Sequence, residues 1–226
     1  KTLEGITHYS TTEYPHINLG KRPVAIGVNS NYREDIHLVY VVDSKDDIVS
    51  IIDGINNTNT RNDIKVGNKP VAIGVNNFTN TIYVANYKNN TVSVINGKYN
   101  NNTGNDIKVG DGPNSIGVDE FTHTVYVANF KNNTVTVIDG LNNTRVKDIP
   151  VGDRPTSIGV DSLTDSIYVT NSYDGTVSVI NGSDKTNTGN DIEVGSVPNS
   201  IGVDSLTDSI YVTHLLDGAV SVIDSM

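Results

Sequence analysis

The chain has no cysteine, no tryptophan and only three phenylalanines among its 226 residues. The absence of cysteine excludes disulfides, thiolate nucleophiles and cysteine-ligated zinc, and it removes cysteine as a guide to the redox compartment. The longest apolar runs, such as residues 38–42, are far too short to cross a bilayer. There is no signal peptide and the first residue is Lys1, so we interpret the sequence as a mature or excised part of a longer protein.

Positive charge is also scarce. Sixteen Lys and Arg stand against 26 Asp and Glu, which gives a formal net charge of −10. No cluster of Lys and Arg forms the basic face that binding to nucleic-acid phosphates requires, and an anionic membrane would repel the chain. We therefore expect neither nucleic-acid binding nor direct membrane insertion, and we expect a self-repelling, soluble surface.

What the sequence has in abundance is a repeat. Five similar segments begin at Tyr residues spaced 43, 43, 42 and 43 positions apart: Tyr40, Tyr83, Tyr126, Tyr168 and Tyr211. A proline-led segment with Ile-Gly-Val precedes each, a Thr-Val-Ser-Val-Ile-type segment follows it, and an Ile-x-Val-Gly segment is the fourth. All four are short, rich in Val, Ile, Tyr and Thr, and bounded by turn residues, which is typical of β-strands. No window shows a helical period over helical length.

Four strands in about 40–45 residues are typical of one blade of a β-propeller. We predict an all-β, single-domain propeller over residues 1–226, with five four-stranded antiparallel blades at about 23–67, 70–110, 113–152, 155–195, and 198–226 plus 14–19. The last unit lacks a fourth strand of its own, so the strand at 14–19 is expected to pair with residues 219–224 and close the ring. A two-sheet sandwich is the alternative fold, but small or apolar residues on both strand faces favour blades covered on both sides.

Two motifs carry a resemblance to a known family. Tyr83-Val-Ala-Asn and Tyr168-Val-Thr-Asn, each followed by Thr-Val-Ser-Val-Ile-Asn-Gly, resemble the YVTN family of β-propeller repeats, together with the recurring Val-Gly-x-x-Pro-x-x-Ile-Gly-Val. This resemblance covers residues 14–226. It implies a propeller displayed at the cell surface, as in archaeal surface-layer proteins, and no single set of catalytic residues. Similar family members often have seven blades, so the five units here form either a complete ring or a cut from a longer array.

No catalytic motif is present. The chain has no Gly-x-Ser-x-Gly elbow, Walker loop or Gly-x-Gly-x-x-Gly, its five His share no metal-binding spacing, and the innermost segments read Ile-Gly-Val. We therefore predict a module that is not an enzyme and that binds no cofactor. The alternative is a propeller enzyme of the lactonase or lyase type, which needs ionisable side chains converging on the central axis. A lectin with one site in every blade is a third hypothesis.

Two pairs of carboxylates lie four residues apart in the turns Asp-Ser-Leu-Thr-Asp, namely Asp161 with Asp165 and Asp204 with Asp208. They are weak candidates for Ca²⁺ ligands, although Asn and His at matching positions of other units favour turn capping. Candidate N-glycosylation sites lie at the seven Asn-x-Ser/Thr sequences, a number close to chance for this composition: Asn56, Asn77, Asn89, Asn101, Asn132, Asn142 and Asn181.

One set of loops is expected to hold the ligand or partner. The loops from the fourth segment to the next first segment, and from the second to the third, should share one face of the disc and vary between units. Exposed aromatic and apolar groups beside cations suit a protein- or glycan-binding face, although the same groups could simply cover neighbouring blades. We therefore predict an extracellular, cell-surface binding or scaffold module with this candidate face: Lys21, Arg22, Lys69, Tyr87, Lys88, Phe130, Lys131, Arg154, Tyr173, His214, Leu215 and Leu216.

Overall fold

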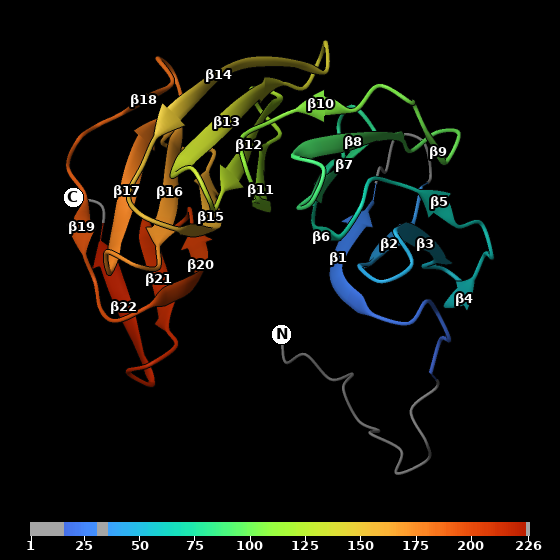
Figure 1. Cartoon of the computed structure of the whole chain (residues 1–226), viewed down its shortest axis with the longest axis horizontal. Helices are drawn as coiled ribbons and strands as arrows, with labels where there is room; N and C mark the ends of the chain where they lie inside the picture. The colour runs from blue at the N-terminus through green and yellow to red at the C-terminus, as the bar shows by residue number, and fades with distance from the viewer. Residues whose placement is uncertain (1–15, 31–35, 225–226) are drawn as a thin grey trace, which may run out of the picture.

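The computed structural model describes residues 16–30 and 36–224, and all regular secondary structure in these ranges is β. The strands form five antiparallel sheets in chain order (Figure 1). Sheet 1 contains β1 (Pro23–Asn29), β2 (Leu38–Asp43), β3 (Ile48–Asp53), β4 (Thr58–Asn59) and β5 (Ile64–Lys65). Sheet 2 contains β6 (Pro70–Asn76), β7 (Thr81–Asn86), β8 (Thr91–Asn96), β9 (Asn101–Asn102) and β10 (Ile107–Lys108).

The remaining sheets repeat this order. Sheet 3 contains β11 (Pro113–Asp119), β12 (Thr124–Asn129), β13 (Thr134–Asp139) and β14 (Thr144–Pro150). Sheet 4 contains β15 (Pro155–Asp161), β16 (Ser166–Asn171), β17 (Thr176–Asn181), β18 (Thr186–Asn187) and β19 (Ile192–Glu193). Sheet 5 contains β20 (Pro198–Asp204), β21 (Ser209–His214) and β22 (Ala219–Asp224). The prediction of an all-β chain made of repeated, four-stranded antiparallel units is thereby confirmed.

The fourth strand is continuous only in sheet 3. In sheets 1, 2 and 4 two short pieces replace it, and both pair with the third strand. The stretch that links the pieces is one residue longer than the matching part of β14. The backbone leaves the strand there through left-handed residues, at Arg61 (φ 59°), Gly104 (φ 77°) and Gly189 (φ 76°). An extra residue opposite a regular strand interrupts the ladder in the manner of a β-bulge.

The hydrophobic core lies between the sheets, in four clusters that each join two successive sheets. The first cluster, for example, joins Tyr40 and Ile51 of sheet 1 to Ile82 and Val84 of sheet 2. A thin sheet cannot bury its own apolar residues, so each sheet depends on a neighbour at either face. This explains why both faces of β2, β7, β12 and β16 are buried.

A glycine in each innermost strand sets the distance between sheets. Gly27, Gly74, Gly117 and Gly159 lie opposite the buried Tyr of the second strand of their sheets. A Cβ on Gly74 would lie 2.5 Å from Cγ2 of Ile116, and one on Gly117 would lie 2.5 Å from Cγ2 of Ile158. The Ile-Gly-Val motif therefore forms both sides of each junction. The glycine of one sheet leaves the space into which the Ile and Val side chains of the next sheet pack.

The five sheets form an arc, with sheet 1 and sheet 5 at its two ends (Figure 1). The innermost strands pack in succession, β1 against β6, β6 against β11, β11 against β15 and β15 against β20. Sheets 5 and 1 make no contact of comparable extent in the part of the chain described. This propeller-like arrangement agrees with the predicted repeat, but it shows no closed ring.

The predicted closing strand needs correction. Residues 16–19 form no strand, β22 pairs only with β21 among the described residues, and residues 14 and 15 lie outside those described. The carbonyl of Asn18 instead accepts a hydrogen bond from Asn59 Nδ2 of sheet 1, at 3.0 Å. The physical reason is that residues 16–22 lead directly into β1, so they stay beside sheet 1 while the arc carries sheet 5 away from it. Over the described ranges there is also no helix of a length and hydrophobicity that could cross a membrane.

Candidate functional site

The predicted candidate face is held together by a repeated contact between two loops. The loop before an innermost strand accepts a backbone hydrogen bond from the loop between the second and third strands. Ser44 N donates to Arg22 O, Tyr87 N to Lys69 O, and Ser172 N to Arg154 O, each at 3.0 Å. Each bond places a cationic residue beside a loop that carries aromatic or basic side chains. The face is therefore a regular product of the repeat rather than an accident of one loop.

Two groups of cation–π contacts lie on this face, one around Tyr87 and one around Arg154. We call the side chains of these two groups the ridge. Lys69 Nζ lies 4.6 Å and Lys131 Nζ 4.9 Å from the centre of the Tyr87 ring. Arg154 Cζ lies 5.1 Å from the centre of the Tyr173 ring and 5.9 Å from that of Phe130. Such cation–π contacts contribute about 0.5–1 kcal/mol each at exposed sites. The ridge thus ties neighbouring sheets together and also keeps its cations at the surface.

An open hollow of about 810 Å³ lies at the start of the ridge, between the loops of sheets 1 and 2. Five basic side chains and one acidic side chain line it, together with Ser44 and Asn68. We call it the cationic hollow: Lys21, Arg22, Lys45, Lys69, Lys88 and Asp47. Lys21 also forms an exposed ion pair with Asp46 at 3.2 Å, which at the surface contributes little to stability.

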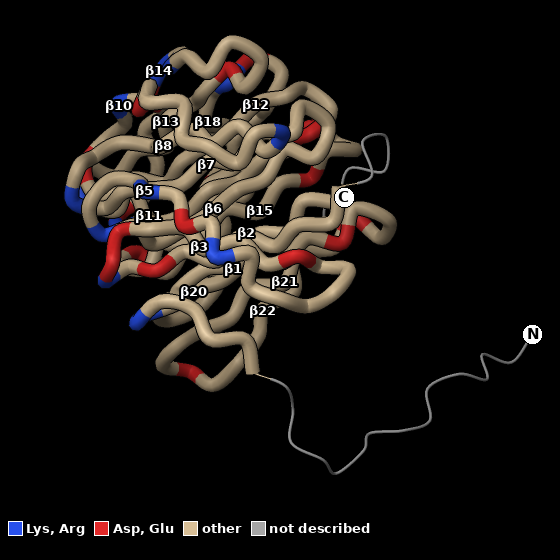
Figure 2. The backbone as a smooth tube through the Cα atoms, turned by 90° about the vertical axis from the view of Figure 1, so that its right-hand side faces the viewer, with Lys and Arg blue, Asp and Glu red and all other residues tan. Residues whose placement is uncertain are grey.

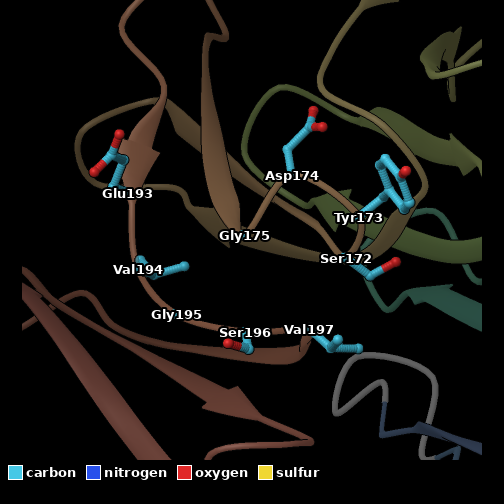
Figure 3. Close-up of a pocket in the computed structure, with 9 residues that line it drawn as sticks. All are labelled: Ser172, Tyr173, Asp174, Gly175, Glu193, Val194, Gly195, Ser196 and Val197. Carbon is cyan, nitrogen blue, oxygen red and sulfur yellow. The ribbon is translucent and has the colours of Figure 1, made fainter.

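Charge changes sign along the same face. A smaller hollow of about 290 Å³ near the middle of the arc is lined by Phe130, Lys131, Asn133, Asp153 and Arg154. Between sheets 4 and 5 a third hollow, of about 430 Å³, contains acids and no cation (Figure 3). There Tyr173 and Asp174 stand on the loop after β16, and Glu193 lies across from them on β19. In Figure 2 most Lys and Arg segments lie on the left of the view, whereas Asp and Glu segments occur on both sides.

Nine of the twelve predicted face residues lie on the ridge or line a hollow, and two more, Leu215 and Leu216, stand exposed at 67% and 73%. Leu215 and Leu216 occupy the matching loop of sheet 5 without touching the ridge pairs. Lys45 belongs to the cationic hollow and was missed by sequence reasoning. Aligning Ser44-Lys45 with Tyr87-Lys88 of the next unit would have found it.

His214 does not belong to the exposed face. It is only 5% exposed, and its Nε2 lies 2.9 Å from Ser221 Oγ. In sheet 2 the matching residue is Asn86, whose Nδ2 donates to Ser93 Oγ at 2.9 Å. His214 therefore replaces the last residue of the Tyr-Val-x-Asn motif and serves the same internal hydrogen bond.

Two of the four candidate Ca²⁺ ligands, Asp161 and Asp204, cap their own turns. Asp161 Oδ1 accepts a hydrogen bond from Leu163 N at 3.0 Å, and Asp204 Oδ1 accepts one from Leu206 N at 3.1 Å. Burial opposes ionisation of Asp161, but hydrogen bonds from Ser205 and from the turn outweigh it and keep its pKa below the usual value. No cluster of three or more His, Asp or Glu suited to a metal ion occurs among the described residues. The geometry is that of turn capping.

A polar contact also crosses the first two junctions between sheets, next to the matching turns. At the first junction the Asn29 side-chain amide donates to Asn80 Oδ1. At the second junction Asn76 Nδ2 lies 3.4 Å from His123 Nδ1. Both Asn29 and Asn76 are fully buried, so these contacts satisfy polar groups that water does not reach.

The third junction has two acids at the same positions, Asp119 and Asp165. Both lie near the buried Tyr126 hydroxyl: burial raises the pKa of Tyr126, and the charges of Asp165 and Asp119 raise it further. Asp165 Oδ1 and the Tyr126 hydroxyl have no hydrogen-bond partner within the described residues. The pair therefore lacks the amide donor that the first junction provides.

Asp165→Asn is expected to stabilise the protein by about 0.5–1.5 kcal/mol, because it supplies an amide donor at a junction where Asp165 Oδ1 and the Tyr126 hydroxyl have no partner within the described residues. Asn tolerates the left-handed conformation that Asp165 adopts, with φ 54°. Thermal unfolding at neutral pH should show a melting temperature a few degrees higher. Asp191→Asn, at an exposed position, removes the same charge and serves as the control. A melting temperature unchanged or lowered by Asp165→Asn would contradict this account.

Six of the seven candidate glycosylation residues are exposed. The seventh, Asn77, is half-buried, and its Nδ2 donates to Glu120 Oε1 at 2.8 Å. Glycosylation modifies that nitrogen atom, so Asn77 is the least suitable of the seven in the folded protein. Glycosylation at the other six stays a prediction.

Comparison with known proteins supports the fold. A chain of hydrazine synthase from Kuenenia stuttgartiensis is similar in structure, with a TM-score of 0.79 and 19% sequence identity, over 97% of this chain and 67% of that chain. At this identity the likeness shows the fold alone. No family model and no curated protein matches the sequence. Folds like this one occur in 1341 solved chains, so the fold by itself identifies no function.

The prediction that the chain is not an enzyme is wrong in its reasoning. It rested on the absence of known catalytic motifs, on the spacing of the five His and on the Ile-Gly-Val innermost strands. Hydrazine synthase is an enzyme, and one of its chains shares this architecture. The fold is therefore compatible with catalysis, and membership of the YVTN family stays a prediction.

Proposed function

We propose that this chain is a binding module of the cell surface whose cationic hollow receives an anionic partner. The observation that carries the proposal is the gathering of five basic side chains around one hollow in a chain with a net charge of −10. Their concentration on a face that also carries the ridge favours recognition of carboxylate or sulfate groups.

The partner that fits this chemistry is a glycan or protein that carries such groups. Lysine ammonium groups bind anions as mobile point charges, whereas Arg22 offers a planar fork suited to two oxygens at once. The Tyr87 ring next to the hollow has the ammonium groups of Lys69 and Lys131 within 5 Å of its centre, so it positions both cations beside the anion site. The repulsion from the rest of the acidic surface would keep other anionic regions of the partner at a distance.

We also propose that the chain belongs to the YVTN family and lies outside the cell. The resemblance in Tyr168-Val-Thr-Asn and its neighbours supports this, and the structure explains why the motif recurs. The last residue, Asn171, is buried and donates through Nδ2 to Ser178 Oγ at 2.8 Å and to Thr176 Oγ1 at 3.0 Å. Labelling of intact cells with an antibody to the chain tests the location, and a signal seen only after lysis would reject it.

Lys45→Glu with Lys88→Glu is expected to weaken binding to a sulfated polysaccharide or to polyglutamate by about 10- to 100-fold, since both charges in contact with the anion are reversed. Binding of dextran sulfate, polyglutamate and neutral dextran to the unmodified chain would be measured by calorimetry at two salt concentrations. Binding should fall as salt rises, because the charges are exposed.

The matched control is Lys108→Glu, an exposed lysine on the outer strand β10 that lies away from the hollow. It reverses one lysine charge, as either hollow substitution does when made alone, and should leave binding within about twofold. If neither polyanion binds, or if Lys108→Glu weakens binding as much as the hollow variants do, the proposal fails. Preference for one polyanion over the other tells whether the partner is a glycan or a protein.

A further inference from the structure

The buried tyrosine at the junction between sheets 3 and 4 lacks the hydrogen bond that its counterparts make. The Tyr40 hydroxyl of sheet 1 donates to Asn100 Oδ1 of sheet 2 at 2.6 Å. The Tyr83 hydroxyl of sheet 2 donates to Asn143 Oδ1 of sheet 3 at 2.8 Å. Tyr126 occupies the same position of sheet 3 and is 0% exposed, but no described residue pairs with its hydroxyl. Because a buried polar group without a partner costs free energy, this junction favours a ligand that the chain's own side chains do not supply.

One substitution in an outer turn explains the missing bond. The residue that accepts this bond is an asparagine in sheets 2 and 3, and the matching residue of sheet 4 is Lys185. An ammonium group only donates hydrogen bonds, and Lys185 Nζ donates to the carbonyl of Gly182 at 3.4 Å. Its charge also acts on Asp139, whose pKa is held low mainly by a hydrogen bond from Asn142 and in part by Lys185. Lys185 is therefore engaged by the outer turns and offers Tyr126 no acceptor.

Two carboxylates stand beside the Tyr126 hydroxyl. Asp119 and Asp165 occupy the positions of the two asparagines that contact each other across the first junction. Asp119 is 1% exposed, Asp165 is half-buried, and Asp165 Oδ1 has no partner among the described residues. Burial is the main cause that raises the pKa of Tyr126, and the charges of Asp165 and then Asp119 raise it further, so both lie close to the hydroxyl. The structure thus sets Asp165 against a carboxylate of the preceding sheet rather than against the acid of its own turn.

The contacts of two matching glycines show that the hydroxyl and the carboxylate converge. A Cβ on Gly140 of sheet 3 would lie 3.0 Å from the Tyr83 hydroxyl of sheet 2. A Cβ on Gly182, the matching glycine of sheet 4, would overlap Asp165 Oδ1. By the symmetry of the repeat Tyr126 reaches Gly182 as Tyr83 reaches Gly140, so two unpartnered oxygen atoms lie near one glycine. This part of the junction is therefore rich in oxygen atoms and negatively charged.

We propose that the junction between sheets 3 and 4 binds a calcium ion through Asp119, Asp165 and the Tyr126 hydroxyl. Oxygen atoms are the ligands that Ca²⁺ prefers, and two carboxylates balance its charge. Ca²⁺ also accepts irregular sets of about six to eight oxygens, completed by backbone carbonyls and water, whereas Mg²⁺ demands a nearly octahedral set. The ion joins sheets 3 and 4 at the place where an amide donor joins sheets 1 and 2.

The surroundings hold one ligand in place and leave the other accessible. Asp119 Oδ1 accepts a hydrogen bond from Phe121 N at 2.9 Å, and Asp119 Oδ2 accepts one from Thr122 Oγ1 at 2.8 Å. Asp165 Oδ2 accepts a hydrogen bond from the exposed Ser183 at 2.7 Å, so the ion can enter from solvent on this side. Since only two carboxylates contribute, we expect a dissociation constant of about 0.1–1 mM, as in extracellular calcium modules.

Calcium-dependent melting tests the proposal. The chain is freed of divalent ions with a chelator, and its thermal unfolding is followed by circular dichroism while calcium, magnesium or sodium chloride is added at matched ionic strength. Calcium at about ten times its dissociation constant should raise the melting temperature by about 2–4 °C, because the ion binds the folded chain and not the unfolded one. Magnesium and sodium should leave the melting temperature unchanged.

Asp165→Asn separates this site from the other carboxylates of the chain. Without calcium the variant should melt at a higher temperature than the unmodified chain, for the reason given above. Its affinity for calcium, measured by calorimetry, should be about 10-fold or more weaker, because one of the two charged ligands is lost. Asp191→Asn removes the same charge at an exposed position and should keep the calcium response. A response equal to that of magnesium, or one that survives Asp165→Asn, overturns the proposal.

Terbium luminescence reports whether the ion lies next to Tyr126. Tb³⁺ replaces Ca²⁺ at oxygen sites and emits when a nearby aromatic ring is excited, and the chain has no tryptophan. Tyr126→Phe should remove most of the emission, whereas Tyr99→Phe, at a tyrosine that is 70% exposed, should preserve it. Emission that persists in Tyr126→Phe places the ion elsewhere and also overturns the proposal. The site lies at the turns, at the opposite ends of the strands from the cationic hollow, so it is tested independently of polyanion binding.

Discussion

Gly117→Val is expected to lower the free energy of unfolding by about 3 kcal/mol or more. A Cβ at this position would lie 2.5 Å from Cγ2 of Ile158 and 2.9 Å from Cγ2 of Val160, both on the next sheet. Neither neighbour can move away freely, since both belong to a strand in the centre of the arc. Overpacking of a tight interface typically costs about 1–3 kcal/mol, and here two branched methyl groups are added where even one carbon does not fit.

The matched control is Gly202→Val, which makes the same substitution at the same position of the repeat. Nothing opposes its Cβ, and valine favours a strand over glycine, so stability should change by less than about 0.5 kcal/mol or increase slightly. Urea unfolding followed by far-ultraviolet circular dichroism measures both variants. Equal losses at the two positions would show that the glycine serves the strand itself and not the packing between sheets.

Unfolding between pH 10 and 12 is the second large effect expected. Burial is the main cause that raises the pKa of Tyr40 from its usual value of 10.0 to about 12. Burial likewise raises the pKa values of Tyr83, Tyr126 and Tyr168. These phenols ionise more readily in the unfolded chain, so their contribution to stability is complete below pH 10 and is lost as the pH rises through the folded pKa values. For Tyr40 alone the loss amounts to about 2–3 kcal/mol.

The measurement is a joint titration of tyrosine ionisation by ultraviolet absorbance and of folding by circular dichroism. The buried tyrosines should ionise together with unfolding, as one transition. Tyr126→Phe should move this transition to higher pH, because its hydroxyl makes no hydrogen bond in the described structure that would be lost. Tyr99→Phe, at a tyrosine that is 70% exposed, should leave it in place. Complete ionisation of the tyrosines in a chain that stays folded would contradict the expected coupling.

The sequence predicted which loops form the candidate face, but it did not predict which side chains contact each other there. Loop composition alone indicated where Lys69, Tyr87 and Arg154 would gather, because loops that vary within a repeat share one face of the stack. The ridge pairs needed the structure, since they join side chains from different sheets whose separation depends on how the sheets pack. His214 shows the limit of this reasoning, because a histidine next to two exposed leucines turned out to serve a buried hydrogen bond.

The amino-acid sequence by itself determined the unit: its length, its four strands, their order and the apolar character of both faces. These features follow from local chemistry, namely β-branched residues in short runs, turn residues between them and a strict period along the chain. Only the tertiary structure decided that sheets 1 and 5 remain apart and that residues 17–19 stay beside sheet 1. Closure depends on the rotation added at each junction, which side-chain packing between sheets sets, and no single repeat encodes the sum of those rotations.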